Sequence, residues 1–245
     1  LKIQEANENL KELGFVAEPV LFSMNKDLKY SNDECFYFAD QIASIANYLT
    51  YEKKFVSFEY NPESFVFSSN FSVKLCMFNY TSLIINAQNH TVPRYPWKNN
   101  SFSPPLNYTA PEYSNNQLTT AAADVFSFGS LITSLFLGHH FFNYQDEKEF
   151  QRAISTGKYD IPESIPTEIG PLLQCCFDAD PSRRLTFSEI SHFPVFMSKV
   201  VKILRSIDMI MTNSQSERFT FYTTIKDNLN LFSQRMLEKK ILPLV

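Results

Sequence analysis

Residues 124–138 read DVFSFGSLITSLFLG, and this run decides the fold. Apolar residues stand on nearly every side of a helix built from it. A helix of that kind is buried all round rather than along one face. The run therefore predicts a helix in the centre of a domain, with other elements packed around it. Asp124, at its start, is expected to cap the helix or to accept bonds from nearby backbone.

Two short motifs stand on either side of this helix. Ala110, Pro111 and Glu112 end a polar, proline-rich stretch, residues 86–106, which predicts a long loop. The second motif, DPSRRLT at Asp180–Thr186, follows an apolar segment that predicts another helix. Each motif alone is a weak signal. Their order around the buried helix is what carries information.

The remaining pattern predicts a mainly α protein with a few short strands. Ser31 and Glu34 have the spacing of a capping box, at the start of a helix that ends near Tyr51. Further helices are expected at Asp146–Thr156, Ile169–Phe177 and Thr186–Ser191. Short strands are expected around Lys54–Ser57, Ser64–Phe67 and Phe71–Cys76.

The tail has a different texture from the rest of the chain. Apolar residues at helical spacing predict two amphipathic helices, separated by the polar segment TNSQSE, residues 212–217. The first is marked by Ile203, Ile207 and Ile210, and the second by Ile225, Leu229, Phe232 and Met236. We interpret residues 197–245 as the first unit of a helical array.

Composition and charge set broad limits on function. The chain has 245 residues, 44% of them hydrophobic and 20% charged, which is ordinary globular usage. A net charge of -4 and a pI near 5.6 argue against non-specific nucleic-acid binding. The four cysteines have no metal-ligand spacing and indicate a reduced, intracellular chain.

In this order, the motifs at Ala110–Glu112, Asp124–Gly129 and Asp180–Thr186 resemble the large helical lobe of a eukaryotic protein kinase. The resemblance covers roughly Phe15–Phe196. It implies a charge pair between Glu112 and Arg184 that holds the end of the activation segment on the lobe. An arginine facing a carboxylate in a partly buried place suits such a role. These residues are expected to maintain the fold and not to catalyse.

The segment FVSFEYNPESFVF, residues 55–67, then corresponds to the catalytic loop. In active kinases this loop reads H-R-D-x-K-x-x-N, where the Asp takes the hydroxyl proton and the Asn binds magnesium. Its degraded counterparts here are Ser57, Phe58 and Glu59 for His-Arg-Asp, Asn61 for the Lys, and Ser64 for the Asn. Glu59 keeps a carboxylate on a side chain one methylene longer.

The metal-binding Asp-Phe-Gly of the family is replaced by Met77, Phe78 and Asn79. Met77 is a poor magnesium ligand because hard cations need oxygen, whereas Phe78 is expected to survive as packing. The chain has five glycines, no two of them close enough for a phosphate-binding loop. We therefore expect no metal and no cofactor, with ATP binding possible only if an N-terminal lobe is present.

The segment Glu18, Pro19 and Val20 looks like a kinase hinge, and the tail from Arg218 looks like the junction to HEAT-type repeats. Both features resemble the SCY-like pseudokinases, in particular their coated-vesicle-associated branch. The resemblance implies an adaptor in clathrin-dependent traffic, with protein partners from vesicle coats or trafficking machinery. It implies a cytoplasmic protein, with peripheral contact to Golgi, endosomal or coated-vesicle membranes.

The expected organisation has three parts. Residues 1–22 end a small lobe and form the hinge, residues 23–196 form the kinase-like large lobe, and residues 197–245 form the helical extension. Two other interpretations stay open. One is an active, atypical Ser/Thr kinase that binds ATP and uses Glu59 as base. The other is a plain helical interaction module.

A few other polar residues have ordinary interpretations with one alternative each. His139 and His140 are expected at a helix end, where a metal role is the alternative. Lys199, Lys202 and Arg205 recur at helical spacing and predict a solvated face, which could instead contact acidic lipid headgroups. Finally, two loop residues are candidates for either modification or packing: Tyr95 and Tyr108.

Overall fold

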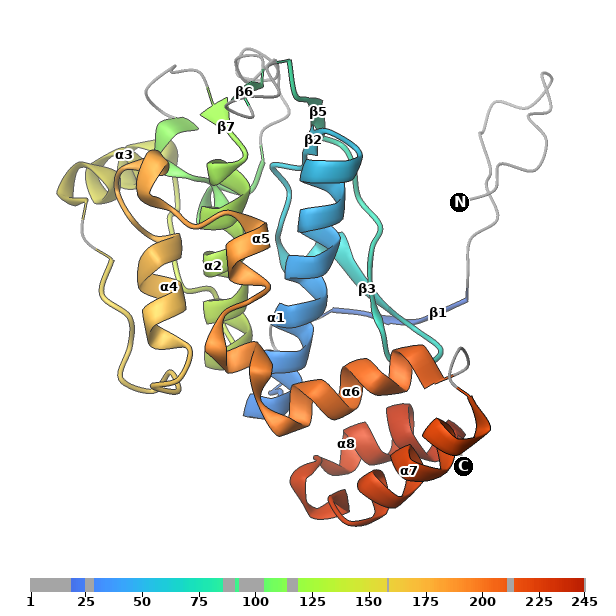
Figure 1. Cartoon of the computed structure of the whole chain (residues 1–245). Coiled ribbons are helices and arrows are strands. Elements are labelled where there is room, and N and C mark those ends of the chain that lie inside the picture. The colour runs from blue at the N-terminus through green and yellow to red at the C-terminus, as the bar shows by residue number, and fades with distance from the viewer. Residues whose placement is uncertain are drawn as a thin grey trace, which may run out of the picture.

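The computed structural model describes most of the chain. The described residues are 19–24, 29–85, 91–92, 104–113, 119–157, 159–210 and 214–244. Helix α1 (Asn32–Asn47) and helix α2 (Ala122–Leu137) lie side by side in the middle of the molecule, and the helices of the tail gather at one end of it (Figure 1). The structure is therefore mainly helical, as the sequence predicts.

Helix α1, Asn32–Asn47, begins with the capping box expected from the sequence. The Ser31 hydroxyl accepts from the Glu34 backbone N–H, and the Glu34 side chain accepts from the Ser31 N–H. A π-helical turn, Tyr48–Glu52, continues the helix toward strand β2 (Phe55–Val56). Helix α1 therefore delivers the chain directly to the segment 55–67.

Helix α2, Ala122–Leu137, is the buried helix predicted from residues 124–138. It ends at Gly138, whose φ of 72° is the left-handed conformation that glycine tolerates best. At Gly129 a Cβ atom would lie 2.7 Å from the Cβ of Cys176, so the glycine allows α4 to pack closely on α2. Asp124 does not cap the helix, because its side chain bonds to a distant loop.

The other helices surround this pair or form the tail. They are α3 (Glu147–Thr156), α4 (Gly170–Cys176), α5 (Phe187–Ile190), α6 (Lys199–Met209), α7 (Gln215–Lys226) and α8 (Gln234–Met236). Phenylalanine and tyrosine rings fill much of the space between elements; the Phe126 ring, for example, stacks on Phe142 with centroids 5.7 Å apart. The high phenylalanine content thus makes an aromatic core.

The described strands are short and pair antiparallel. A three-stranded sheet has the order β1 (Val20–Ser23), β3 (Phe65–Ser68), β4 (Val73–Leu75). Two-stranded sheets join β2 (Phe55–Val56) to β5 (Ser82–Leu83) and β6 (Thr91–Val92) to β7 (Thr119–Thr120). Strands β2, β3 and β4 lie where the sequence predicts strands; β2 and β4 are shorter than expected, and β3 is displaced by one residue.

The tail differs from the prediction. Helix α6 agrees with the first expected helix, but the second expected helix, over Ile225–Met236, is wrong. Helix α7 begins at Gln215, inside the segment expected to separate the two helices, because Ser214 and Glu217 form a capping box. It ends at Lys226, and a short 3-10 turn, Leu229–Leu231, precedes α8.

The tail packs on the kinase-like part through charges on α1. Arg205 on α6 donates from Nε and Nη2 to the carboxylate of Asp40 on α1, and Nε lies 2.8 Å from Oδ2. The Arg205 side chain is 36% exposed and its charge is paired with Asp40, which corrects the expectation that Arg205 only lies on a solvated face. At the start of α1, Glu34 accepts bonds from the Ser233 hydroxyl at 2.8 Å and from Arg235 at 3.4 Å. The tail helices are thus fixed to the lobe.

In the part of the chain that the structure describes, no helix has both the length and the apolar character needed to cross a bilayer. The four cysteines, Cys35, Cys76, Cys175 and Cys176, are free thiols, and burial raises the pKa of the Cys35 and Cys176 thiols. Buried thiols of this kind act as small apolar side chains.

Candidate functional site

Asp124 holds the backbone of the predicted catalytic loop. Its Oδ2 accepts from the Ser57 N–H and its Oδ1 from the Phe58 N–H, both at 2.7 Å. Phe58 has a φ of 57°, a left-handed conformation that these bonds help to hold. Complete burial raises the pKa of Asp124 to about 7, although the two N–H bonds act in the opposite direction. The loop position is therefore set by the buried helix.

Glu59 is the residue that would act as base, and its carboxylate is already occupied. Its Oε2 accepts from the backbone N–H of Asn79 at 2.9 Å, and its Oε1 accepts from the Asn79 side-chain amide at 3.0 Å. Only 4% of Glu59 is exposed. Because Glu59 is buried and both of its oxygens are bonded to Asn79, this contact is a latch between two segments rather than a poised base.

The two other polar loop positions also bond within the loop. The Ser64 hydroxyl, at the predicted magnesium-binding position, donates to the Glu59 backbone carbonyl. The Asn61 side-chain oxygen accepts from the Glu63 N–H at 2.9 Å and begins the 3-10 turn Pro62–Ser64. Ser64 and Asn61 are buried. Their polar atoms therefore stabilise the loop conformation.

Met77, Phe78 and Asn79 follow strand β4 and lie beside the loop, as expected from their place in the sequence. The expectation that Phe78 is packed is wrong for the described residues, because 45% of it is exposed. Leu83 and Ile85, which follow in the sequence, are also exposed apolar side chains. Its ring therefore does not contribute to the core described here.

The residues at these positions do not fit a magnesium ion. Magnesium needs several oxygen ligands in octahedral geometry, usually carboxylates. Met77 supplies a thioether, the Ser64 hydroxyl donates inward, and both oxygens of Glu59 face N–H donors. Among the residues that the structure describes, no group of three acidic, histidine or cysteine side chains can hold a metal.

The ion pair expected from the motifs is present. Arg184 Nη1 lies 2.7 Å from Glu112 Oε1 and Nη2 lies 3.0 Å from Oε2, a bidentate contact between two buried side chains. The same guanidinium donates to the Ala122 carbonyl and lies 5.2 Å from the centre of the Phe126 ring. Arg184 therefore joins the 3-10 turn Pro111–Tyr113 to the start of α2.

The predicted hinge is only partly described. Glu18 lies outside the described residues, Pro19 precedes β1, and Val20 is the first residue of that strand. Val20 pairs with Ser68 of β3. The start of the described chain is thus part of a sheet, and the hinge role stays a prediction. Ala110 is buried next to the Glu112 turn.

The histidine pair has local partners. His140 Nδ1 lies 2.8 Å from the Tyr108 hydroxyl, and His139 Nδ1 lies 2.9 Å from the His140 carbonyl. Tyr108 is buried, which favours the packing interpretation over modification. The other tyrosine considered, Tyr95, lies outside the described residues.

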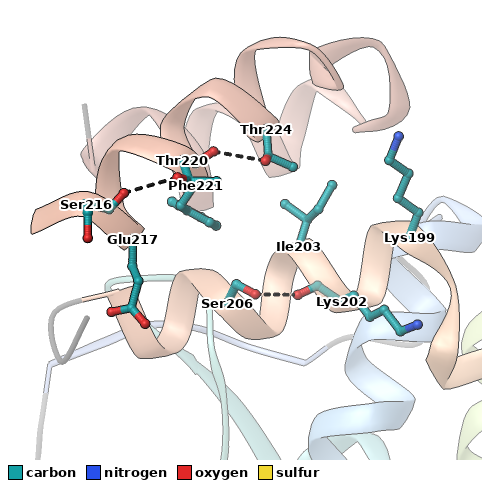
Figure 2. A pocket seen from close by; sticks show the side chains of 9 residues that line it. All are labelled: Lys199, Lys202, Ile203, Ser206, Ser216, Glu217, Thr220, Phe221 and Thr224. Carbon is teal, nitrogen blue, oxygen red and sulfur yellow. Dashed lines mark hydrogen bonds between the residues drawn. The ribbon is translucent and has the colours of Figure 1, made fainter. Parts of the chain in front are cut away.

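A groove of about 470 Å³ separates α6 from α7. Figure 2 shows Ile203 and Phe221 between the two helices and Lys199 and Lys202 near one end. The hydroxyls of Ser206, Thr220 and Thr224 donate to carbonyls of their own helices. Lys199 and Lys202 keep the exposure that the sequence predicts.

Sequence reasoning missed the Asn79 contact with Glu59. Its signal is the polar residue directly after Phe78, at the place where the family has glycine. It also missed the contacts of Asp208 and Lys240, which bring α6, the end of the tail and strand β4 together. Neither residue stands in a motif.

Comparison with known sequences defines the class of protein. The sequence model of the family described as protein tyrosine and serine/threonine kinase matches residues 13–193. This is most of the chain, which therefore belongs to the protein kinase family. The kinase match ends before α6 begins.

Three relatives illustrate the range of similarity. The protein kinase domain-containing protein ppk32 of Schizosaccharomyces pombe is 27% identical over 205 residues, 78% of this chain and 26% of its own. The serine/threonine-protein kinase ppk21 of that yeast is 26% identical over 172 residues, 70% of this chain and 31% of its own. The protein kinase-like protein SCY1 of Saccharomyces cerevisiae is 24% identical over 271 residues, 99% of this chain and 34% of its own. The chain thus spans about a quarter to a third of these relatives.

Proposed function

We propose that this chain is a degraded protein kinase domain that serves as a scaffold and does not transfer phosphate. The single observation that carries this proposal is the latch between Glu59 and Asn79. It places Glu59, the carboxylate at the predicted position of the catalytic Asp, in a buried position with both oxygens bonded. A kinase needs this carboxylate to accept the proton of the substrate hydroxyl.

The loss of metal ligands points the same way. Phosphoryl transfer depends largely on divalent ions that neutralise charge on the phosphates. Met77 and Ser64 stand at the two positions that would bind these ions, and neither presents a free oxygen toward a common centre. No step through magnesium or ATP follows from these residues.

We further propose that the scaffold acts in clathrin-dependent vesicle traffic. The similarity to SCY1 extends over 99% of the chain and so includes the tail beyond residue 193. The tail is fixed to the lobe by Arg205–Asp40 and Arg235–Glu34. Partners are then proteins of vesicle coats or the trafficking machinery. Exposed Lys199 and Lys202 are available for peripheral contact with acidic membranes.

The first half of the proposal is tested by phosphoryl transfer from radiolabelled magnesium-ATP to a generic protein substrate. The full-length protein and its Glu59→Gln variant are compared under the same conditions. We expect the same background label with both. Label that the wild type transfers and Glu59→Gln does not would overturn the proposal in favour of an atypical kinase with Glu59 as base.

The second half is tested separately by cosedimentation of the purified full-length protein with clathrin-coated vesicles. Vesicles stripped of their coats are the control. We expect the protein in the pellet only when coats are present. Equal amounts in both pellets, or none in either, would overturn the proposed role at the coat without affecting the result on phosphoryl transfer.

A further inference from the structure

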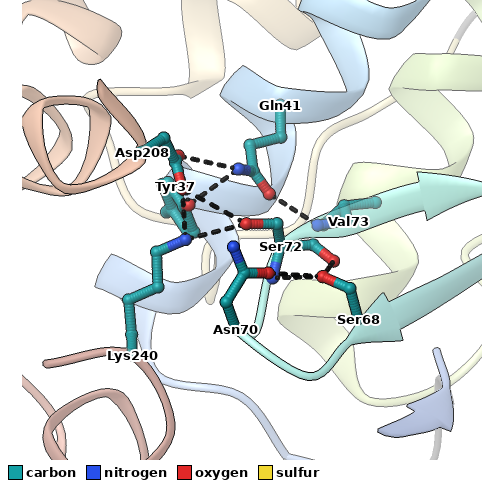
Figure 3. Close-up of polar contacts among 8 residues, drawn as sticks. All are labelled: Tyr37, Gln41, Ser68, Asn70, Ser72, Val73, Asp208 and Lys240. Carbon is teal, nitrogen blue, oxygen red and sulfur yellow. Dashed lines mark hydrogen bonds and ion pairs between the residues drawn. The ribbon is translucent and has the colours of Figure 1, made fainter. Parts of the chain in front are cut away.

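A buried lysine from the end of the tail reaches the sheet next to the candidate site. Lys240, in the π-helical turn Leu237–Ile241, is only 2% exposed. Its Nζ donates to the Ser72 hydroxyl at 2.8 Å and pairs with the carboxylate of Asp208 on α6 (Figure 3). It also lies 5.3 Å from the centre of the Tyr37 ring on α1. Three separate parts of the chain therefore meet at one ammonium group.

Asp208 spreads this contact to strand β4. Its Oδ2 accepts from the Tyr37 hydroxyl at 2.7 Å and from the Gln41 amide at 3.1 Å. The Gln41 oxygen in turn accepts from the backbone N–H of Val73, the first residue of β4, at 2.7 Å. Tail, α1 and β4 thus share one hydrogen-bond network (Figure 3).

The turn between β3 and β4 is held in a strained form at this place. Phe71 has a φ of 58°, which costs a non-glycine residue about 1–2 kcal/mol. Its ring is fully buried and stacks on Phe67 with centroids 4.9 Å apart. The turn is therefore stable only while its packing and the bonds to Ser72 are in place.

The hairpin connects this turn to the candidate site. In the pairing of β3 with β4, Phe67 lies opposite Val73 and Phe65 lies opposite Leu75. Beyond these pairs, the Cys76 N–H donates to the Ser64 carbonyl at 2.9 Å. Three strand residues span about 10 Å at 3.3 Å per residue. Asn79 and its bonds to Glu59 follow three residues later. A short, continuous ladder thus joins the tail network to the latch.

The tail is held in a way that allows release. A buried ion pair returns little more than the desolvation of its two charges costs, so the Lys240–Asp208 contact adds specificity more than stability. The other contacts of this segment are few: Met236 and Ile241 are its buried apolar side chains, and Arg235, whose side chain is 35% exposed, contacts Glu34 at 3.4 Å. Local opening of such a segment is easier than unfolding of the lobe.

We propose that residues 234–244 are a clamp on the β3–β4 hairpin, with Lys240 as its contact point. While the clamp is docked, the hairpin holds Asn79 against Glu59. When a partner draws the clamp away, the strained turn at Phe71 relaxes and the latch at Glu59 loosens. The tail and the candidate site are then linked, whether or not the site transfers phosphate.

Hydrogen exchange measured by mass spectrometry tests this link on the full-length protein. Lys240→Glu places a like charge against Asp208 and is expected to undock the clamp. Residues 73–79, which include the bonded amides of Val73, Cys76 and Asn79, should then exchange about ten times faster, equivalent to about 1.4 kcal/mol. Residues 125–135 of α2 should keep their protection.

Lys239→Glu is the matched control, because Lys239 is exposed on the same turn. Lys239→Glu should leave the exchange rates of residues 73–79 and 125–135 unchanged. Wild-type exchange at residues 73–79 in Lys240→Glu would overturn the proposal, even if the tail itself exchanges faster.

If Lys240→Glu also increases the exchange rate of residues 125–135, the Ser72→Ala variant tests the clamp instead. This variant removes the bonds of the Ser72 hydroxyl to Lys240 and to Asp208, while the Lys240–Asp208 pair stays intact. Faster exchange at residues 73–79 would support the clamp, and an unchanged rate would overturn it.

Discussion

Two buried carboxylates of the lobe, Glu112 and Glu59, have the same coordination but different partners. Each accepts bonds at both oxygens: Glu112 from the cationic fork of Arg184, Glu59 from the neutral backbone and amide of Asn79. The first pair occupies positions where the family needs a charge pair. The second lies where the resemblance to the family predicts the catalytic base.

The comparison supports our proposal that this chain keeps the interactions that assemble a kinase lobe and uses the carboxylate of the predicted catalytic loop for structure. The bonds from Asp124 to the loop backbone are among the interactions that assemble the lobe, because they set the path of the chain and not its reactivity. A carboxylate that is useful for stability must be bonded. A carboxylate that is useful as a base must be accessible.

The largest effect is expected at the Glu112–Arg184 pair. Arg184→Met leaves the carboxylate of Glu112 buried without its cation, which should lower the free energy of unfolding by about 3–5 kcal/mol. Denaturant unfolding followed by circular dichroism measures this change. Arg183→Met is the control, since the Arg183 side chain is 74% exposed and should change stability by less than about 0.5 kcal/mol.

A double-mutant cycle sharpens this prediction. Glu112→Gln in the Arg184→Met background removes the stranded charge and should recover part of the lost stability. Additive effects of the two changes would show that the pair does not act as a unit. The contrast between the Glu112–Arg184 charge pair and the Glu59–Asn79 contact would then have no basis in stability.

A smaller effect is expected at the latch. Asn79→Ala removes the amide donor to Glu59 but keeps the backbone N–H, so about 1.5 kcal/mol of stability should be lost. The change is measured by the same unfolding experiment. The control is Asn230→Ala, at an exposed position of the tail. If Asn79→Ala leaves stability unchanged, the Asn79 side-chain amide does not hold Glu59, and one oxygen of that carboxylate is closer to a free base.

The fold could be predicted because its signals are local or belong to ordered motifs. The helix at residues 124–138 is apolar all round, and the capping box at Ser31 and Glu34 marks the start of α1. The Ser214–Glu217 pair has the same spacing, so the start of α7 was also visible in the sequence. There the apolar spacing from Ile225 onward suggested a longer helix that the chain does not form.

The contacts of the site could not be predicted in the same way. Asn79 and Glu59 are 20 residues apart, and Arg205 and Asp40 are 165 apart. Side chains so far apart in sequence meet only because the hairpin and the tail fold back on α1. Charge spacing on a single helix predicted solvent exposure for Arg205 because it holds no information about the neighbouring helix.

The smallest effect concerns the pH dependence of Asp124. The carboxyl group has a pKa of about 7 in the folded protein and about 3.9 when unfolded. Between these values the folded state binds a proton that the unfolded state does not, so stability is greatest at low pH and falls as pH rises through 7. From pH 6 to pH 8 this contribution should decrease by about 1 kcal/mol.

The comparison is made with Asp124→Asn, which removes the titrating carboxyl group and keeps the other titratable side chains of the chain. The wild type should lose about 1 kcal/mol more than this variant between pH 6 and pH 8 in urea unfolding experiments. Parallel curves would mean that the N–H groups of Ser57 and Phe58 keep Asp124 ionised throughout. Asp124 would then be a permanent charge, like Glu112, and its bonds to the loop would be as strong as the charge pair that closes the lobe.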